Sequence, residues 1–134
     1  MAVMRYLLLV LCLPLMTVCD ERPTGPTSLL NTEFILEPGE SMRIEGAALT
    51  VRFNGVSGDS RCPADVFCIQ GGDAVVRITA RSDSSTHDYE LHTGNMRPVQ
   101  HDAITIALVQ LSPYPFSSRT IQPDEYRATL IVRR

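Results

Sequence analysis

From Glu33 to the end of the chain, hydrophobic side chains recur with a period of two. This period is typical of β-strands that have one buried and one solvent-facing side, whereas a helix would show a period of 3.6. The alternation covers residues 33–37, 41–45, 49–54, 74–81, 88–92 and 126–133. Residues 103–111 (AITIALVQL) are apolar at both sets of positions, which predicts a central strand covered on both sides. No segment has the pattern of an amphipathic helix, so the sequence predicts an all-β fold.

Turn signals separate these segments, including Pro38-Gly39-Glu40 and the serine-rich residues 82–85. Short strands with such punctuation are typical of a sandwich or a small barrel. We expect one antiparallel β-sandwich of about seven or eight strands, with a small β-barrel as the alternative. Residues 121–126 (IQPDEY), followed by alternation, resemble the entry to a late strand of immunoglobulin-like domains, which suggests an immunoglobulin-like sandwich.

Residues 1–19 predict export. Arg5 precedes an apolar run from Tyr6 to Met16, and no acidic residue occurs before Asp20. A basic start followed by an apolar stretch of this length is typical of a secretory signal peptide. The run is shorter than the ~20 apolar residues of a spanning helix, which makes an uncleaved anchor the weaker alternative. We therefore expect the protein in the bacterial cell envelope.

The end of the signal resembles a bacterial lipoprotein signal. In Leu15-Met16-Thr17-Val18-Cys19, the cysteine would be acylated and become the new N-terminus, although Val18 stands where such signals have Gly, Ala or Ser. Residues 20–32, rich in Pro, Thr and Gly, would form a flexible tether to a domain at residues 33–134. Cleavage after Cys19 is the alternative, giving a soluble periplasmic or secreted protein.

Cys62 and Cys68 are the two cysteines of the predicted domain. An even pair in an oxidising compartment predicts a disulfide. The five intervening residues do not match the C-x-x-C spacing of thiol oxidoreductases, and zinc sites need further ligands. The bond should therefore staple a surface loop.

The segment around these cysteines carries a resemblance. Asp59-Ser60-Arg61-Cys62-Pro63, the later Cys68-Ile69-Gln70-Gly71-Gly72-Asp73-Ala74 and the segment Glu90–Gly94 (ELHTG) are similar to a family of small exported bacterial proteins of unknown activity. In that family the second cysteine usually starts C-V-W-A-G, where this chain has Gln70 and Gly71. The resemblance extends over the domain from Phe34 onward and implies no activity.

A non-catalytic binding module is the function that we expect, because a stapled loop on a rigid sheet is preorganised for recognition. We expect the contact residues to be Arg61, Phe67 and Gln70, joined by Tyr114 and Phe116 of a proline-rich loop. The two aromatic residues could instead close the end of the core. The expected partners are the membrane, through the N-terminal lipid, and an unidentified envelope protein or ligand.

Two other functions stay open at this point: metal binding and a purely structural envelope role. His87, His92 and His101, with Asp88 and Glu90, offer ligands for Zn²⁺ or Cu²⁺. Three aspartates near the cysteines offer oxygen ligands for Ca²⁺, although their spacing fits no EF-hand: Asp59, Asp65 and Asp73.

We predict neither an enzyme nor a bound cofactor, because the chain has no nucleophile elbow, phosphate loop or dinucleotide motif. The basic residues are twelve arginines spread along a chain of net charge −3. This distribution argues against nucleic-acid binding.

Overall fold

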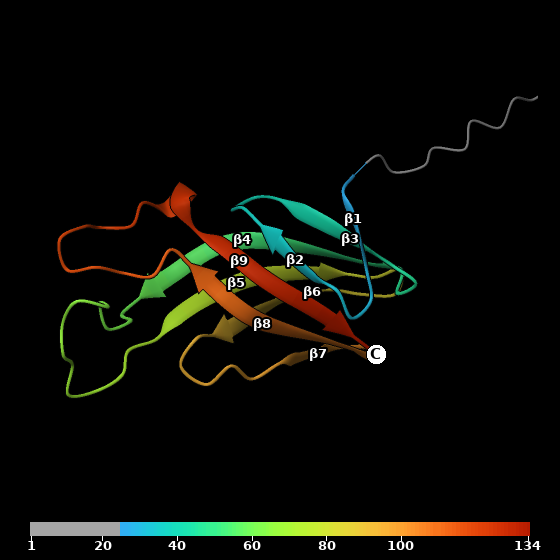
Figure 1. Ribbon diagram of the computed structural model, residues 1–134. Helices are drawn as coiled ribbons and strands as arrows, with labels where there is room; N and C mark the ends of the chain where they lie inside the picture. The colour runs from blue at the N-terminus through green and yellow to red at the C-terminus, as the bar shows by residue number, and fades with distance from the viewer. Residues whose placement is uncertain (1–24) are drawn as a thin grey trace, which may run out of the picture.

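A computed structural model describes residues 25–134, which contain nine strands and one helical turn (Figure 1). The elements, in chain order, are β1 (Thr27–Leu29), β2 (Glu33–Leu36), β3 (Ser41–Glu45), β4 (Leu49–Asp59), β5 (Ala74–Arg81), β6 (Thr86–His92), β7 (Val99–His101), β8 (Ile104–Ser112), η1 (Pro123–Glu125) and β9 (Arg127–Arg133). In this part of the chain, no helix is long and apolar enough to cross a bilayer.

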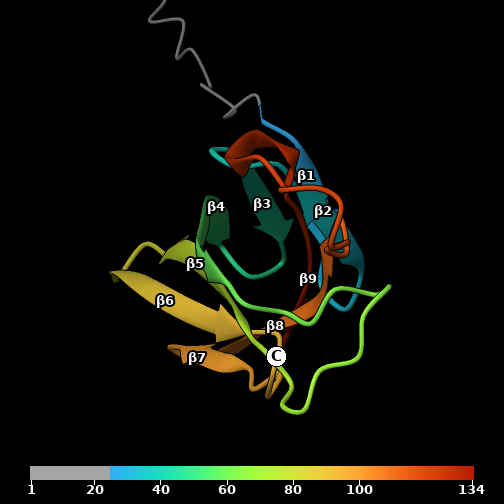
Figure 2. The same ribbon diagram turned by 90° about the vertical axis from the view of Figure 1, so that its left-hand side faces the viewer.

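The strands form two sheets, which lie face to face as the two layers of a sandwich (Figure 2). Sheet A has the order β1-β3-β4-β5-β6, and sheet B has the order β2-β9-β8-β7. All neighbouring strands are antiparallel except β1 and β3, which are parallel. The predicted all-β sandwich is confirmed, and the barrel alternative is wrong because the described strands form two separate sheets.

The core lies between the sheets and consists of the alternate residues that the period of two selects. Val51 and Phe53 of β4 are fully buried, and the same core includes Ile78 of the neighbouring β5 and Leu130 of β9 in the opposite sheet. β4 is the longest strand and shifts register against β5 near Gly55, whose φ of +122° favours glycine. Register shifts of this kind bend a strand and increase its local twist.

Three expectations need correction. The domain has nine strands rather than seven or eight, because β1 and β7 have only three residues each and give little periodic signal. β1 also lies within the range 20–32 that we expected as a tether, so the ordered domain begins before Glu33. The outer side of β8 is half-buried at Thr105, Ala107 and Val109 rather than covered. The predicted signal peptide and Cys19 lie outside the described residues.

The two ends of the sandwich differ. At one end, the long loops after β4 and after β8 project beyond the sheets (left in Figure 1). The tight turns between β3 and β4, β5 and β6, and β7 and β8 lie at the other end, where the chain also finishes. The first described strand, β1, lies on the side of these turns. Loops are the usual carriers of function on such a scaffold, so the looped end is the candidate site.

We expect Phe53→Ala to lower the free energy of unfolding by about 3–5 kcal/mol, because the substitution leaves a cavity in the fully buried centre of β4. Urea denaturation measures the change. Ile35→Ala is the control, since Ile35 is 60% exposed on β2 and should change stability by less than about 0.5 kcal/mol. Equal effects of the two substitutions would contradict the assigned core.

Candidate functional site

The loop between β4 and β5 is closed by a disulfide between Cys62 and Cys68, as the sequence predicts. The two Cα atoms are 6.0 Å apart, and six positions separate the cysteines in sequence. This loop lies beside the loop that joins β8 to η1 (Figure 1), and hydrogen bonds connect the two loops. The disulfide loop and its neighbour therefore form one unit at this end of the sandwich.

Arg61 holds this unit to both sheets. Its side chain is only 6% exposed and lies under the loop, not on the surface. Nε and Nη2 donate to the two carboxylate oxygens of Asp59, at 2.8 and 2.6 Å. Nη1 donates to the carbonyl of Leu111 at 2.8 Å, and Nη2 also donates to the carbonyl of Pro113 at 3.0 Å. The expectation that Arg61 contacts a partner is therefore wrong, since the guanidinium is committed to the fold.

Asp59, the partner of Arg61, has an 11% exposed side chain at the end of β4. Burial raises the pKa of this carboxyl, but the hydrogen bonds and positive charge of Arg61 outweigh that effect and lower the pKa below its ordinary value. The hydroxyl of Tyr126 also donates to Asp59, at 3.0 Å. Burial and this negative neighbour raise the pKa of Tyr126. The cluster thus joins β4 of sheet A to residues of sheet B.

Asp65 connects the disulfide loop to the proline-rich loop. Its carboxylate accepts from the backbone nitrogen and the hydroxyl of Ser117, at 2.8 and 2.5 Å. These hydrogen bonds lower the pKa of Asp65. Ala64 donates its N–H to the carbonyl of Pro115 at 2.9 Å. The ring of Tyr114 faces the Arg61 guanidinium, 5.4 Å from the ring centroid, so each loop supports the other.

Asp73 fixes the far end of the disulfide loop. Its carboxylate accepts from the backbone nitrogen of Gly94 at 2.8 Å, contacts His92 Nδ1 at 2.6 Å and accepts from the Thr93 hydroxyl at 3.2 Å. Burial raises the pKa of Asp73, but these partners, His92 first, outweigh burial and lower the pKa. The two segments that carry the family resemblance, 59–74 and 90–94, therefore meet at Asp73.

Gly72 has a steric role in the same place. A Cβ at this position would lie 1.5 Å from the backbone oxygen of Ser60, so the two sides of the loop approach too closely for any side chain. Around Gly71 there is open space within 4 Å of such a Cβ. Of the two adjacent glycines, only Gly72 is required by the packing.

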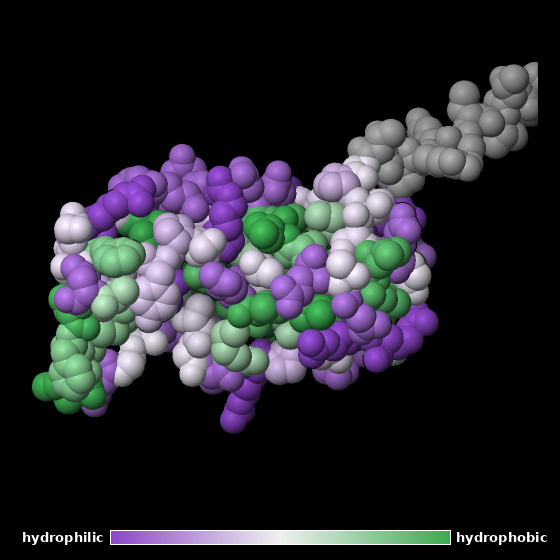
Figure 3. All heavy atoms as spheres, in the orientation of Figure 1, coloured by the Kyte–Doolittle hydropathy of each residue, from purple (hydrophilic) through white to green (hydrophobic). Residues whose placement is uncertain are grey.

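The loop exposes large apolar side chains at its end. Phe67 is 95% exposed and Ile69 is 97% exposed, and the neighbouring Val66 is also exposed. We call these three residues the apolar tip. In Figure 3 a hydrophobic protrusion occupies the position of this loop at the lower left. Few solvated loops of a monomeric protein present such side chains together.

The other predicted contact residues lie next to the apolar tip or in the neighbouring proline-rich loop. Gln70 is exposed next to Ile69. Tyr114 and Phe116 are about half exposed, so they neither close the core nor project freely. Sequence reasoning missed Val66 and Ile69. The sequence did carry a signal for them, because Val66 and Ile69 are apolar residues in a loop that lacks the alternation of a half-buried strand.

The histidines do not converge. His92 is paired with Asp73, whereas His101 is fully buried and lies 5.8 Å from the ring of His87, centroid to centroid. The described residues include no group of three or more His, Cys, Asp or Glu side chains placed to hold an ion. Asp59, Asp65 and Asp73 bind different partners and do not share a centre. The geometry thus gives no support to either metal hypothesis.

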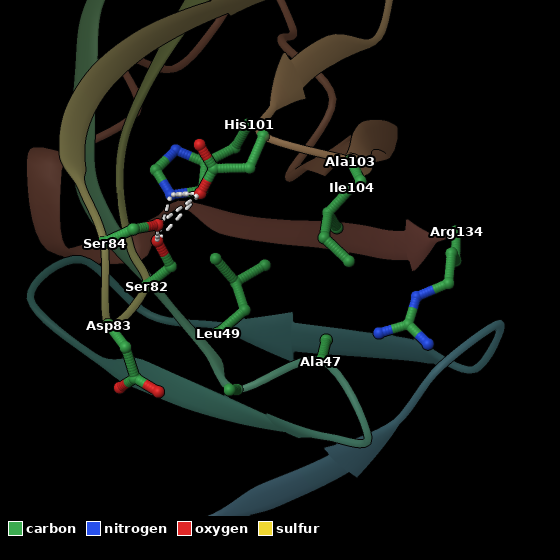
Figure 4. A pocket seen from close by; sticks show the side chains of 11 residues that line it. Ala47, Leu49, Ser82, Asp83, Ser84, His101, Ala103, Ile104 and Arg134 are labelled. Atoms are coloured by element: carbon green, nitrogen blue, oxygen red, sulfur yellow. Dashed lines mark hydrogen bonds and ion pairs between the residues drawn. The ribbon is translucent and has the colours of Figure 1, made fainter.

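His101 lies at the opposite end of the sandwich, at a pocket of about 280 Å³ (Figure 4). Its Nε2 lies 3.2 and 3.3 Å from the hydroxyls of Ser85 and Ser82, and its Nδ1 lies 3.2 Å from the Tyr89 hydroxyl. The Asp102 carboxylate is 3.6 Å from the same Nε2. In a Ser-His-Asp triad the carboxylate instead holds Nδ1, so this arrangement differs from one. It joins β7 of sheet B to β6 and the β5–β6 turn of sheet A.

Comparisons with protein-family models, with curated proteins and with solved structures found no match to this chain.

We expect Gly72→Ala to destabilise the domain by about 2–3 kcal/mol, the upper part of the usual range for single substitutions, because the Cβ would displace the backbone at Ser60. The matched control is Gly71→Ala, which meets open space and should change the free energy of unfolding by about 0.5 kcal/mol or less. Thermal and urea unfolding of both variants measure this difference. Similar stabilities would show that the close approach at Gly72 is not required.

Acid should weaken the looped end. The pKa values of Asp59 and Asp73 are lowered by folding, so both groups stabilise the fold above their unfolded pKa of about 3.9. That stabilisation is lost as the pH falls through the lower pKa values of the folded protein. The free energy of unfolding should therefore decrease below about pH 4.

Asp59→Asn removes one of these contributions and leaves Arg61 buried without its counter-charge. We expect this variant to lose about 3–5 kcal/mol at pH 7 and to show a weaker decrease in stability below about pH 4. Urea unfolding between pH 2 and pH 7 provides the measurement. Asp124→Asn, at an exposed site in η1, is the control. An unchanged acid dependence in Asp59→Asn would contradict the role of this pair.

Proposed function

We propose that this protein is an exported, lipid-anchored and non-catalytic binding module of the bacterial cell envelope. It would belong to the family of small exported proteins that residues 59–74 and 90–94 resemble. Cleavage after Cys19 would give a soluble periplasmic or secreted form of the same module. The supporting observation is the apolar tip, whose Phe67 and Ile69 are almost fully exposed on a loop that is fixed at both ends.

A fixed loop favours recognition because little conformational entropy remains to be lost on binding. The disulfide, the Arg61 cluster and the Asp65–Ser117 contacts constrain the loop before any partner arrives. Burying Phe67 or Ile69 in a partner would contribute about 1.5–3 kcal/mol each. Such side chains at the centre of a contact act as anchors of binding.

The shape of the tip indicates the kind of partner. The apolar side chains lie on a protrusion, not in a groove (Figure 3), so a complementary surface is a concave apolar pocket on another envelope protein. The tip also lies far from the turns beside which the chain enters the domain (Figure 1). A domain held through its N-terminus would therefore present the tip away from its anchor.

Site-specific crosslinking in the bacterial envelope tests this proposal. A photoreactive amino acid replaces Phe67, and a second version of the protein carries it at Gln100, an exposed position on β7 of sheet B. We expect a discrete crosslinked protein from position 67 but not from position 100. Adding Ile69→Ser should reduce the yield at position 67 by about tenfold, because one of the two almost fully exposed apolar side chains is lost.

Equal products from positions 67 and 100 would contradict the proposal, as would a yield at position 67 that Ile69→Ser leaves unchanged. Gln70→Ser is the matched control for Ile69→Ser, since it alters an adjacent exposed residue without removing apolar surface. The crosslinked partner is then identified by mass spectrometry and examined for an apolar pocket at the site of attachment.

A further inference from the structure

A row of alternating threonines and arginines crosses the outer side of sheet A. Strand pairing aligns these residues side by side on all five strands: Thr27, Arg43, Thr50, Arg81 and Thr86. We call them the arginine–threonine row. Its positions alternate with the core residues of their strands, so the side chains project to solvent. The two arginines lie two strands apart, which is about 10 Å.

The arginines of the row have no partner among the described residues. Within residues 25–134, neither Arg43 nor Arg81 has a carboxylate within 4.0 Å, whereas Arg61, Arg119 and Arg127 each form an ion pair. A small pocket of about 120 Å³ lies between them and is lined by Thr50 and Ser82 as well. Two guanidinium groups with hydroxyls between them are suited to phosphate oxygens.

Four acidic side chains occur near the arginine–threonine row, and three of them lie away from the small pocket between the two arginines. Asp88 accepts a hydrogen bond from Thr79, and Glu90 lies opposite Arg77 in the strand pairing. Glu45 lies beyond Arg43 at the end of β3. Asp83 lines the small pocket but is not within ion-pair distance of either guanidinium. Arg52, an exposed residue two positions after Thr50 on β4, adds a positive charge beside the row.

The chain enters the domain at one end of this row. Pro26 accepts a hydrogen bond from the backbone nitrogen of Arg43 at 3.1 Å, and Thr27 begins the row. Cys19, the proposed lipidation site, precedes Pro26 by seven residues. Even a fully extended chain of that length reaches only about 25 Å. An anchor at Cys19 would thus hold the arginine–threonine row close to the lipid surface.

We propose that the arginine–threonine row docks on the anionic phospholipid headgroups of the membrane that holds the anchor. This inference rests on the proposed lipid anchor. Its chemistry is the pairing of Arg43 and Arg81 with headgroup phosphates, with threonine hydroxyls as additional donors. In β4, Asp59 lies nine positions after Thr50, which corresponds to about 30 Å along the strand. Docking at the row therefore leaves the apolar tip free for its partner at the far end.

Arginine modification on vesicles tests the docking. The full chain, as its cells process and export it, is incorporated into phosphatidylcholine vesicles with or without phosphatidylglycerol. A phenylglyoxal reagent then modifies the arginines, and mass spectrometry gives the rate at each position. We expect modification of Arg43, Arg52 and Arg81 to be at least about fivefold slower with phosphatidylglycerol. High salt should remove this protection.

Two double variants with the same loss of charge complete the experiment, and Arg52 is the reporter in both. Arg43→Gln with Arg81→Gln should abolish the protection of Arg52. Arg97→Gln with Arg133→Gln, at exposed positions outside the row, should leave it intact. Circular dichroism and thermal unfolding check that both variants are folded. Equal effects of the two double variants on the protection of Arg52 would contradict the docking.

Equal modification rates in both vesicle types would overturn the proposal, and so would protection that neutral vesicles also give. Protection by an acidic polysaccharide but not by anionic vesicles would assign the row to a glycan and overturn the lipid assignment. Intact mass separates these failures from failure of the proposed function. An acylated Cys19 without protection refutes only the docking, whereas an unmodified Cys19 refutes the anchor itself.

Discussion

The buried ion pair between Arg61 and Asp59 is the interaction on which the looped end depends. All three nitrogens of the Arg61 side chain donate hydrogen bonds: Nε and Nη2 to the Asp59 carboxylate, Nη1 to the carbonyl of Leu111, and Nη2 also to the carbonyl of Pro113. A buried arginine without these acceptors would be strongly unfavourable, because its charge would be desolvated without compensation. The charge is satisfied only when β4, the end of β8 and the loop after it are in their native positions. The same contacts therefore connect the two sheets and define the base on which the disulfide loop stands.

His101 has a corresponding place at the other end. It is the other buried polar or charged side chain of the described residues, and it connects β7 to Tyr89 of β6 and to the serines of the β5–β6 turn. Between Arg61 and His101 the sheets meet through apolar side chains, whose packing specifies position less sharply than directed hydrogen bonds do. A buried polar side chain at each end of the sandwich thus connects the two sheets by hydrogen bonds, in addition to the apolar core between them. The looped end carries the candidate contact surface. The opposite end, with the tight turns, adjoins the arginine–threonine row and the point where the chain enters the domain.

Alternation from Glu33 onward was sufficient to predict the fold class, since the core follows it closely. The sequence could not reveal β1, because Pro26 and the polar residues around it look like a linker and only pairing with β3 orders them. Arg61 was expected at the surface because two of its acceptors, the carbonyls of Leu111 and Pro113, lie about fifty positions away in sequence. The disulfide was predicted from local residues alone, and the exposure of Phe67 is consistent with the predicted surface loop. The row of Arg43 and Arg81 was not foreseen, because arginines dispersed along the chain become neighbours only through strand register.

The proposed binding function requires that the apolar tip is held rigidly before it meets a partner. Backbone ¹⁵N relaxation of residues 62–70 in the oxidised protein measures this directly. We expect order parameters for Phe67 and Ile69 close to those of the strands, about 0.8 or higher. We also expect a clear decrease when Arg61 is replaced by methionine in the disulfide-bonded protein, because the base of the loop is then released. Values below about 0.6 in the unmodified protein would mean a flexible tip and would contradict a preorganised binding loop.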